Sequence, residues 1–420
     1  MKKVTALLMA ALLVFSLAGC GQKEEAESKG EEKKTTEAAK AETEAAREET
    51  SGSPGESGEA SGDPIKIGLT TVLTGDRSLE GQYASNAVEL IEEEINGAGG
   101  VLGRPVEVVI EDALGTDVGA VNAYRKLAAD EDIVAIIGPD SSNDGMAQSP
   151  SALEFEILTT AQGSSPTLRD MCNNDNEWLF QLRACDETLC AALIKYAVED
   201  MGLESFAILH DTETSSADQA RLFTEALAAY DIEPEVVVPF TTGTKDFSSQ
   251  IAQVQNSGAE AIIGAAFQTE AAILVTQIRS MGMDVPILGS NAFADPVTIQ
   301  LAGDATDDVY CASAWVPNTP NPKGNAFAAK YQETYGEECG KAAAQIYDHV
   351  SIICEAIERA GSTDRAAVRD AMNTIDSYEG AITTYDCRTN GDCGRGGLLV
   401  RVQDQKAEII AQITSEKVID

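Results

Sequence analysis

Apolar and polar residues alternate along residues 64–420 in a regular succession of short apolar runs and amphipathic stretches. The run at 65–70 is typical of a strand, and the stretch at 83–95 carries its apolar residues at helical spacing. This pair of patterns recurs and predicts a parallel sheet with helices on both faces. The first series comprises strands at 65–70, 106–110, 133–137 and 157–160, and helices at 83–95, 118–129 and 144–155.

The pattern restarts after a change at residues 179–184. The second series has helices at 189–200, 219–230, 251–256 and 271–281, alternating with strands at 205–210, 236–239, 259–267 and 285–288. Three more helices, at 325–335, 342–360 and 365–372, precede a strand-rich end over 381–413. We therefore predict an α/β protein of two doubly wound parallel-sheet lobes, since a body of this length favours two cores over one.

The first 20 residues have the pattern of a lipoprotein signal. Lys2 and Lys3 precede an apolar run at 4–17, which is too short to cross a bilayer as a helix. Small residues then lead to Cys20. We expect Cys20 to become the lipidated N-terminus, because two acyl chains hold a protein on the outer face of the cell membrane. The alternative is an ordinary secretory signal with an incidental cysteine.

Residues 21–63 contain no Ile, Leu, Val, Phe, Tyr or Trp and cannot form a core. We expect a disordered acidic tether with a reach of roughly 35 to 40 Å. The whole chain has 69 acidic and 30 basic residues. This excess of negative charge makes nucleic acid or an anionic lipid surface an improbable partner of the body.

The common catalytic motifs are missing from the sequence, including the nucleophile elbow, the HExxH zinc motif and the glycine-rich phosphate loops. His210 and His349 are the only histidines, and neither has a local nucleophile or acid at the spacing of a triad. We expect both to pack or to form hydrogen bonds. The sequence predicts neither an enzyme nor a cofactor.

Eight cysteines follow Cys20, and an even number in an exported body favours disulfides over a metal site. Cys387 and Cys393 flank an Asn-Gly turn signal and are the best pair. Cys172 with Cys185 or Cys190 is a second possibility. Paired CxxC motifs are lacking, so we predict no zinc.

The body resembles the type I periplasmic-binding fold, most closely the leucine, isoleucine and valine binding proteins of ABC importers. The motifs that carry this resemblance are Leu73-Thr74-Gly75, Ile95-Asn96, the segment 99–105, the segment 136–139, His210-Asp211, 245–247 and 287–289. The resemblance implies a monomeric extracytoplasmic receptor that closes around a small solute and delivers it to a membrane permease. A separate ATPase subunit would hydrolyse ATP.

The resemblance also implies lobe boundaries. One lobe would comprise 64–184 with 316–382, and the other 185–314 with 383–420. The chain would cross between them near 183–186, 312–316 and 381–386.

Candidate ligand contacts in the first lobe follow from the same resemblance. Ser141 and Ser142 lie between a predicted strand and helix, where backbone N–H groups and a hydroxyl suit a carboxylate. Ser164 matches the family's second hydroxyl contact, with backbone groups from Gln162 and Gly163 beside it. Helix capping is the alternative role for both serines.

In the second lobe Phe267 falls where the family has an aromatic residue over the ligand. Asn291 stands where the family has an acid for the α-ammonium, and Ser215 where it often has Tyr. Because an amide cannot neutralise an ammonium group, Glu80 or Asp295 would have to supply that charge. The pocket is therefore expected to be more polar than one built for leucine.

Three alternatives remain open at this point. One is a cargo of an amide, a nucleoside or another polar solute in place of an amino acid. The others are a ligand sensor with the same fold and a hydrolase that uses Ser141 or Ser164. Arg77 is a candidate partner for a second anionic group, with a solvated surface role as its alternative.

Overall fold

The computed structural model describes residues 60–420 except 76, 175, 389–390, 415–417 and 420. The predicted signal, the Cys20 anchor and the tether over 21–59 lie outside the described residues. Residues 60–63, which we assigned to the tether, pack against the body. The Ser61 N–H donates to the Gly103 carbonyl at 3.0 Å, and Arg104 Nε donates to the Asp63 carbonyl at 2.9 Å.

A five-stranded parallel sheet forms the first half of the body, in the order β2-β1-β3-β4-β5. All five residues of β3 are buried, as expected of a strand covered on both faces. The strands are β1 (Ile65–Thr71), β2 (Val106–Asp112), β3 (Ile133–Ile137), β4 (Leu158–Ala161) and β5 (Leu179–Gln181). The helices around them are α1 (Ser78–Gly97), α2 (Asp117–Ala128), α3 (Ser142–Phe155), α4 (Pro166–Asn174), α10 (Pro322–Tyr335), α11 (Lys341–Ala360) and α12 (Arg365–Met372).

The second sheet has eight strands in the order β15-β14-β13-β10-β9-β8-β6-β7. It is parallel from β7 to β10, but β13, β14 and β15 add to it antiparallel. The predicted parallel sheet is thus extended by a C-terminal antiparallel hairpin. The strands are β6 (Phe206–Asp211), β7 (Val236–Phe240), β8 (Ala261–Ala265), β9 (Ile287–Gly289), β10 (Val309–Ser313), β13 (Gly397–Gln403), β14 (Lys406–Ile413) and β15 (Val418–Ile419).

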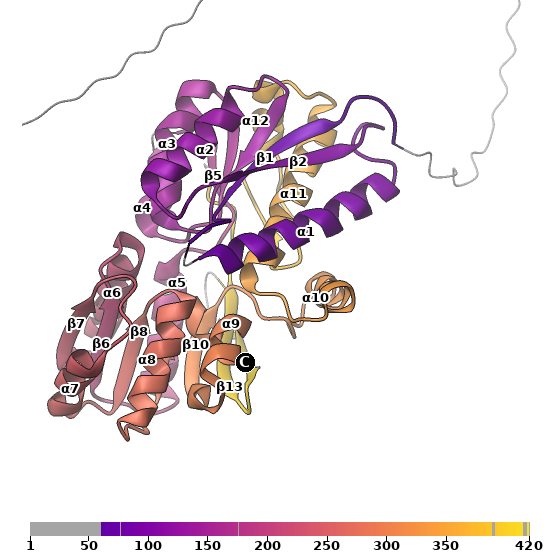
Figure 1. Cartoon of the computed structure of the whole chain (residues 1–420). Helices are drawn as coiled ribbons and strands as arrows, with labels where there is room; N and C mark the ends of the chain where they lie inside the picture. The colour runs from indigo at the N-terminus through magenta and orange to yellow at the C-terminus, as the bar shows by residue number, and fades with distance from the viewer. Residues whose placement is uncertain (1–59, 76, 175, 389–390, 415–417, 420) are drawn as a thin grey trace, which may run out of the picture. The chain divides into compact units, whose positions relative to one another are not determined.

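Helices cover both faces of the second sheet, as Figure 1 shows. They are α5 (Asp186–Glu199), α6 (Thr214–Ala228), α7 (Ser248–Ser257), α8 (Gln268–Ser280) and α9 (Pro296–Ala302), with 3-10 turns η1 (Asn291–Ala294) and η2 (Gly303–Thr306). Phe293 of η1 packs directly on the sheet, where a Cβ at Gly264 or Gly289 would lie 2.3 Å from its ring or Cβ atoms. Only glycine fits at these two strand positions.

The chain passes between the two sheets after β5, after β10 and between α12 and β13. The third passage carries a small ribbon of β11 (Tyr378–Glu379) and β12 (Thr384–Tyr385). Asp348 of α11 holds this passage, since its carboxylate accepts from the N–H groups of Ala381 and Ile382 at 2.5 and 2.8 Å and from the Tyr385 hydroxyl at 2.7 Å.

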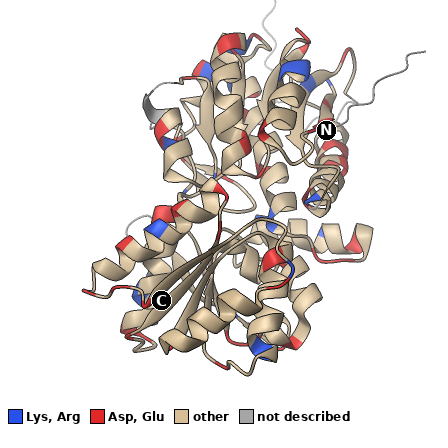
Figure 2. Cartoon of the chain, turned by 60° about the vertical axis from the view of Figure 1, so that its left-hand side comes forward, with Lys and Arg blue, Asp and Glu red and all other residues tan. Residues whose placement is uncertain are grey.

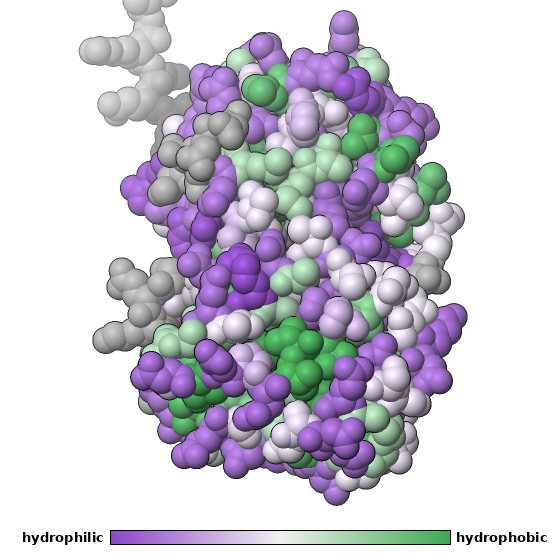
Figure 3. Space-filling view, turned by 90° about the vertical axis from the view of Figure 1, so that its left-hand side faces the viewer, coloured by the Kyte–Doolittle hydropathy of each residue, from purple (hydrophilic) through white to green (hydrophobic). Residues whose placement is uncertain are grey.

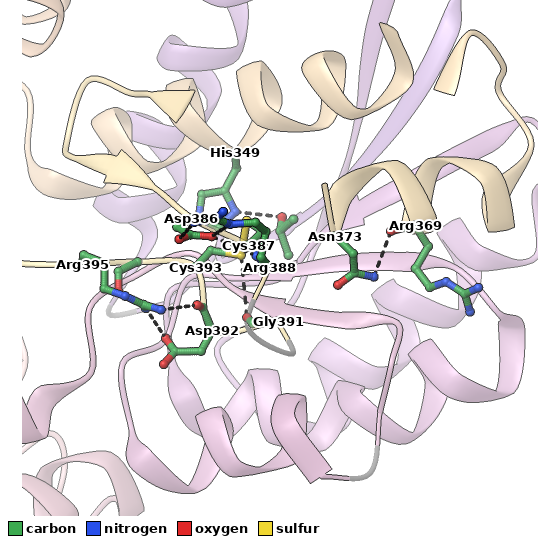
Figure 4. Close-up of a disulfide and its surroundings, with 12 residues drawn as sticks. His349, Arg369, Asn373, Asp386, Cys387, Arg388, Gly391, Asp392, Cys393 and Arg395 are labelled. Carbon is green, nitrogen blue, oxygen red and sulfur yellow. Dashed lines mark hydrogen bonds and ion pairs between the residues drawn. A yellow bond between two sulfur atoms is a disulfide. The ribbon is translucent and has the colours of Figure 1, made fainter. Parts of the chain in front are cut away.

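The structure joins Cys387 to Cys393 by a disulfide in the third passage, with their Cα atoms 4.3 Å apart (Figure 4). The possible second disulfide, of Cys172 with Cys185 or Cys190, is not present, and Cys172 and Cys185 are, like Cys190, free thiols. Cys172 Sγ instead turns back to the Leu168 carbonyl of its own helix at 3.3 Å. Burial raises the pKa of both thiols to about 12, which keeps them protonated.

Asp and Glu residues are spread along the whole body, and Figure 2 shows far fewer Lys and Arg residues. The face in Figure 3 is largely hydrophilic, with apolar side chains gathered in its lower half. In the part of the chain that the structure describes, no helix combines the length and apolar character that a membrane span requires.

Candidate ligand-binding site

Two neighbouring cavities lie where the carboxyl ends of the parallel strands face each other, the place where open α/β sheets bind ligands. The outer cavity has a volume of about 640 Å³, and the inner cavity about 60 Å³. Ser141, Phe267 and Gln268 line both. The outer cavity is further lined by Arg77, Glu80, Asp144, Glu213 and Asp295, among others. The inner cavity is further lined by Asp140, Ser142, Ser164, Arg183, Ser215, Asn291 and Lys341, among others.

The two serines at the start of α3 have different roles. Ser141 occupies the N-cap position, yet its side chain makes no capping hydrogen bond and has no other partner among the described residues. The Ser142 hydroxyl accepts from the N–H groups of Ser164 and Ser165 at 3.1 and 3.2 Å. Ser142 therefore fixes the neighbouring loop with its side chain, while the Ser141 hydroxyl is available to a ligand.

The loop after β4 presents Ser164 to the inner cavity. Capping of α4 falls to Ser165, whose hydroxyl accepts from the N–H groups of Thr167 and Leu168. The Ser164 hydroxyl has no hydrogen-bond partner within the described part of the chain. Capping therefore does not account for Ser164, and its contact with a ligand stays a prediction.

Gln162 lines neither cavity, contrary to our expectation. Its side-chain nitrogen Nε2 donates to the Gly138 carbonyl at 2.5 Å, and its backbone carbonyl accepts from Gln345 Nε2 at 3.0 Å. Both polar groups are thus bonded inside the protein. Gln162 thus links the end of β4 to the end of β3 and to α11.

Lys341 and Asp140 form a buried ion pair at the inner cavity, with Lys341 Nζ 2.5 Å from Asp140 Oδ1. Lys341 also donates to Gln345 Oε1 at 2.9 Å. Burial alone would raise the pKa of Asp140, but the charges of Lys341 and Arg183 outweigh it and hold that pKa below its usual value. Burial and the nearby Arg183 lower the pKa of Lys341.

Arg183, like Lys341, was not among the ligand-binding residues predicted from the sequence. It follows β5, lines the inner cavity and is only 8% exposed. Its guanidinium group makes no hydrogen bond or ion pair with any described residue, and its Nε is buried without a partner. The sequence marked residues 179–184 only as a change of pattern, and a single arginine there gave no signal that it would be buried.

Glu80 of α1 lines the outer cavity and is 8% exposed. Its Oε1 is buried without a partner, and burial together with the charge of Asp140 raises the pKa of its carboxyl. Arg77 does not have the solvated surface role that the sequence left as its alternative. Its Nη2 lies 3.0 Å from Asp144 Oδ2, and its guanidinium carbon lies 5.2 Å from the centre of the Phe267 ring.

The polar residues of the second sheet are largely bonded within their own half. Asn291 Oδ1 accepts from the Ala314 N–H at 2.7 Å, and its amide nitrogen makes no hydrogen bond to a described residue. Asp295 caps α9, with Oδ1 accepting from the Val297 N–H at 3.0 Å. Phe267 stands at the N-cap of α8 and lines both cavities.

A polar contact joins the two halves beside the cavities. Asn143 Nδ2 donates to Glu213 Oε2 at 2.6 Å, and Asn143 Oδ1 accepts from the Ser215 N–H at 3.2 Å. Ser215 thus serves this contact and also lines the inner cavity. Of the eight predicted ligand contacts, the structure brings all but Gln162 to one or both cavities.

The two histidines lie away from both cavities. His349 is buried beside the Thr160 hydroxyl at 2.8 Å, and burial lowers its pKa to about 3, which keeps it neutral. Nδ1 of His210 contacts the Asp211 carbonyl at 2.8 Å. Within the described ranges, no group of three or more His, Cys, Asp or Glu side chains is placed to hold a metal ion.

Comparison with known proteins agrees with this architecture. The Leu/Ile/Val-binding protein homolog 3 of Brucella melitensis is 26% identical over 78% of this chain and 88% of its own length. The leucine binding protein LivK of Thermotoga maritima superposes with a TM-score of 0.77 at 25% identity, over 84% of this chain and 99% of its own.

A solute binding protein of R. palustris in complex with benzoate gives a TM-score of 0.76 at 17% identity, over 85% of this chain and 98% of its own. At that identity the likeness shows the fold alone. The family model described as "Periplasmic binding protein" matches residues 64–407. The predicted type I fold is confirmed, and the chain belongs to the periplasmic binding protein family.

Proposed function

We propose that this protein is the extracytoplasmic substrate-binding component of an ABC importer and that it captures an amino acid between its lobes. The observation that supports this most is the inner cavity, around which Ser141 and Ser164 of the first sheet face Phe267 and Asn291 of the second. Hydroxyl groups and a basic side chain without protein partners suit a carboxylate. A pocket built from two halves suits capture by closure.

The ligand would bind first to the lobe of 64–184 with 316–382. The lobe of 185–314 with 383–420 would then close, with Phe267 covering the ligand and the Asn291 amide donating to it. Closure excludes water and strengthens each polar contact. The closed form is what the permease would recognise, and a separate ATPase subunit would drive transport.

The membrane anchor belongs to the same proposal. A lipid on Cys20 would keep the monomeric receptor on the outer face of the membrane, within reach of its permease. A receptor held in this way needs no catalytic turnover. We therefore propose that the protein is not an enzyme and uses no cofactor.

The polar lining favours a cargo other than a purely branched-chain amino acid. The outer cavity carries several acidic side chains, and the inner one carries two cations. A non-amino-acid solute such as an amide or nucleoside is the second candidate, and the benzoate-bound neighbour shows that this fold accommodates cargo of another chemistry. A ligand sensor with the same fold differs only in its membrane partner.

A thermal-shift screen of the purified full-length chain tests the proposal. Amino acids are compared with amides, nucleosides and aromatic acids, because a ligand confined to the folded state raises the melting temperature. We expect stabilisation by an amino acid, with loss of the shift in Ser141→Ala and Ser164→Ala. The matched control is Ser362→Ala, because Ser362 lines neither cavity. If another class of solute raises the melting temperature and no amino acid does, the proposed amino-acid cargo is wrong.

A further inference from the structure

We infer that the ligand is a zwitterion whose anionic group binds Arg183 in the inner cavity and whose cationic group binds Glu80 in the outer cavity. This assignment rests on the proposed function and names the residues that would set its specificity. Both residues belong to the half of the body that carries the first sheet. Neither side chain makes a hydrogen bond or an ion pair with the other or with any described residue.

The inner cavity is a built anion site. Arg183 is 8% exposed, and its guanidinium group has no partner. Of the other charged residues there, Lys341 is neutralised by Asp140, and Asp186 accepts from Gln219 Nε2 at 2.9 Å at the start of α5. Arg183 is therefore the one cation among the described lining residues that forms no hydrogen bond or ion pair.

A buried, unpaired guanidinium is costly unless an anion meets it. The free hydroxyls of Ser141 and Ser164 line the same small space, which is about the size of one carboxylate or similar group. Together the three groups supply positive charge and hydrogen-bond donors to the oxygens of one anionic group of a ligand. Such a ligand group explains why this cation is buried here.

The outer cavity has the complementary feature. Glu80 is 8% exposed, and its carboxylate has no hydrogen-bond donor among the described residues. The other carboxylates close to it are occupied, since Asp144 pairs with Arg77 and Asp295 caps α9. Glu80 is thus a buried acid that an incoming cation meets without displacing a hydrogen bond or an ion pair of the protein.

The Asn291 carbonyl oxygen is unavailable for that role because it accepts from the Ala314 N–H at 2.7 Å. Only its amide nitrogen is free, and that group is a donor. Asn291 thus suits the anionic end of the ligand. The charge that an acid at this position would supply comes instead from Glu80, across the cleft.

Two matched sets of probes test the assignment in thermal-shift and calorimetric titrations of the full-length chain. One set is L-leucine, leucinamide and 4-methylpentanoate, and the other is 5-aminopentanoate, pentylamine and pentanoate. Within each set the first compound carries both charges and the others carry one. We expect a zwitterion to stabilise the protein and its singly charged analogues to bind at least tenfold more weakly.

Two variants then locate the charges. Arg183→Met and Glu80→Gln should each lower the affinity for the zwitterion at least tenfold. Their melting temperatures without ligand should equal or exceed that of the unmodified protein, because each variant removes a buried unmatched charge. This second readout separates loss of binding from loss of folding. Arg125→Met and Glu154→Gln alter an exposed Arg–Glu pair on α2 and α3 and serve as matched controls.

The outcomes distinguish the two proposals. If a zwitterion stabilises the protein and both variants bind it as tightly, the assignment to Arg183 and Glu80 is overturned while the proposed function stands. Equal binding of a singly charged analogue has the same meaning. If no zwitterion stabilises the protein, the amino-acid cargo and the assignment both fail.

Discussion

The two halves of the body treat the polar groups that face the cavities in opposite ways. In the first, Arg183 and Glu80 are buried without partners, and the hydroxyls of Ser141 and Ser164 are free. In the second, the side-chain oxygens of Asn291 and Asp295 accept from backbone N–H groups. The first half thus presents charged groups that have no hydrogen bond or ion pair, whereas these oxygens of the second half are bonded before any ligand arrives.

This difference separates recognition from closure. Fixed charges that are not paired within the protein are preorganised for a ligand, at a cost to the stability of the empty protein. A half whose polar oxygens are already bonded loses few hydrogen bonds when it opens and closes. We therefore expect changes in the first half to alter affinity, and changes at the junction of the two halves to alter their closure.

The largest effect should come from the one cation of the inner cavity that is already paired. Lys341→Met leaves Asp140 buried beside the cavity without its partner at 2.5 Å. Loss of one member of a buried pair costs about 3 to 5 kcal/mol. Urea unfolding without ligand should show this loss, while Arg183→Met shows none.

This contrast separates paired from unmatched charge in the same cavity. A loss below about 1 kcal/mol for Lys341→Met would show that Arg183 neutralises Asp140 in its place. The two cations would then be interchangeable, and Arg183 would not be the unmatched one.

The second effect is a pH dependence of stability that Glu80 causes. Burial and the charge of Asp140 raise its pKa from 4.5 to about 7, and Asp295 adds to this while Arg77 and Lys341 oppose it. The folded protein therefore holds this proton more tightly than the unfolded chain does. The resulting stability is complete below about pH 4.5 and is lost as the pH rises to about 7.

A shift of this size corresponds to at most about 3 kcal/mol. Urea unfolding of the empty protein between pH 4.5 and 7.5 should show the decline, and Glu80→Gln should flatten it by that amount. Asp348 also has a raised pKa, about 6, because of burial, but it is present in both proteins and cancels in the comparison. Parallel curves for the two proteins would place the proton elsewhere.

The third effect tests which end of the ligand the second half meets. Asn291→Asp preserves an oxygen for the Ala314 N–H but replaces the free amide donor with negative charge. If the anionic end lies in the inner cavity, affinity should fall about tenfold, equivalent to about 1.4 kcal/mol. Calorimetric titration with the stabilising amino acid measures it. A gain in affinity would instead place the ammonium group at this position.

The fold followed from local pattern wherever an element was long and strongly apolar. The strand predicted at 133–137 is β3, with every residue buried. The pattern did not assign α4 (Pro166–Asn174), which contributes only Leu168 and Cys172 to a buried cluster. It indicated β5 only as a change at 179–184, because that strand is three residues long.

The site was less predictable because its charges depend on partners far apart in the sequence. Lys341 and Asp140 are 201 positions apart, and nothing local to either residue shows that they pair. The same holds for an absence of partners, as at Arg183. The serines were predictable from the resemblance, but only the contacts showed that Ser142 is used inside the protein whereas Ser141 is free.

The smallest effect concerns one of the polar contacts between the halves, the contact of Asn143 with Glu213 and Ser215. Asn143→Ala removes the hydrogen bonds to Glu213 and from Ser215, which are half-buried. Partly exposed polar contacts of this kind contribute about 1 kcal/mol together, which corresponds to roughly a fivefold change in the ratio of closed to open forms. Small-angle X-ray scattering of the empty protein should show a larger radius of gyration in the variant.

The control is Asn373→Ala at the C-terminal end of α12, where the Asn373 side chain bonds to the Arg369 carbonyl (Figure 4). Addition of a stabilising amino acid should bring variant and unmodified protein to the same radius, because the ligand then supplies the closing energy. If the variant differs from the unmodified protein only when ligand is bound, Asn143 acts on the ligand, and recognition would extend beyond the unmatched charges of the first half.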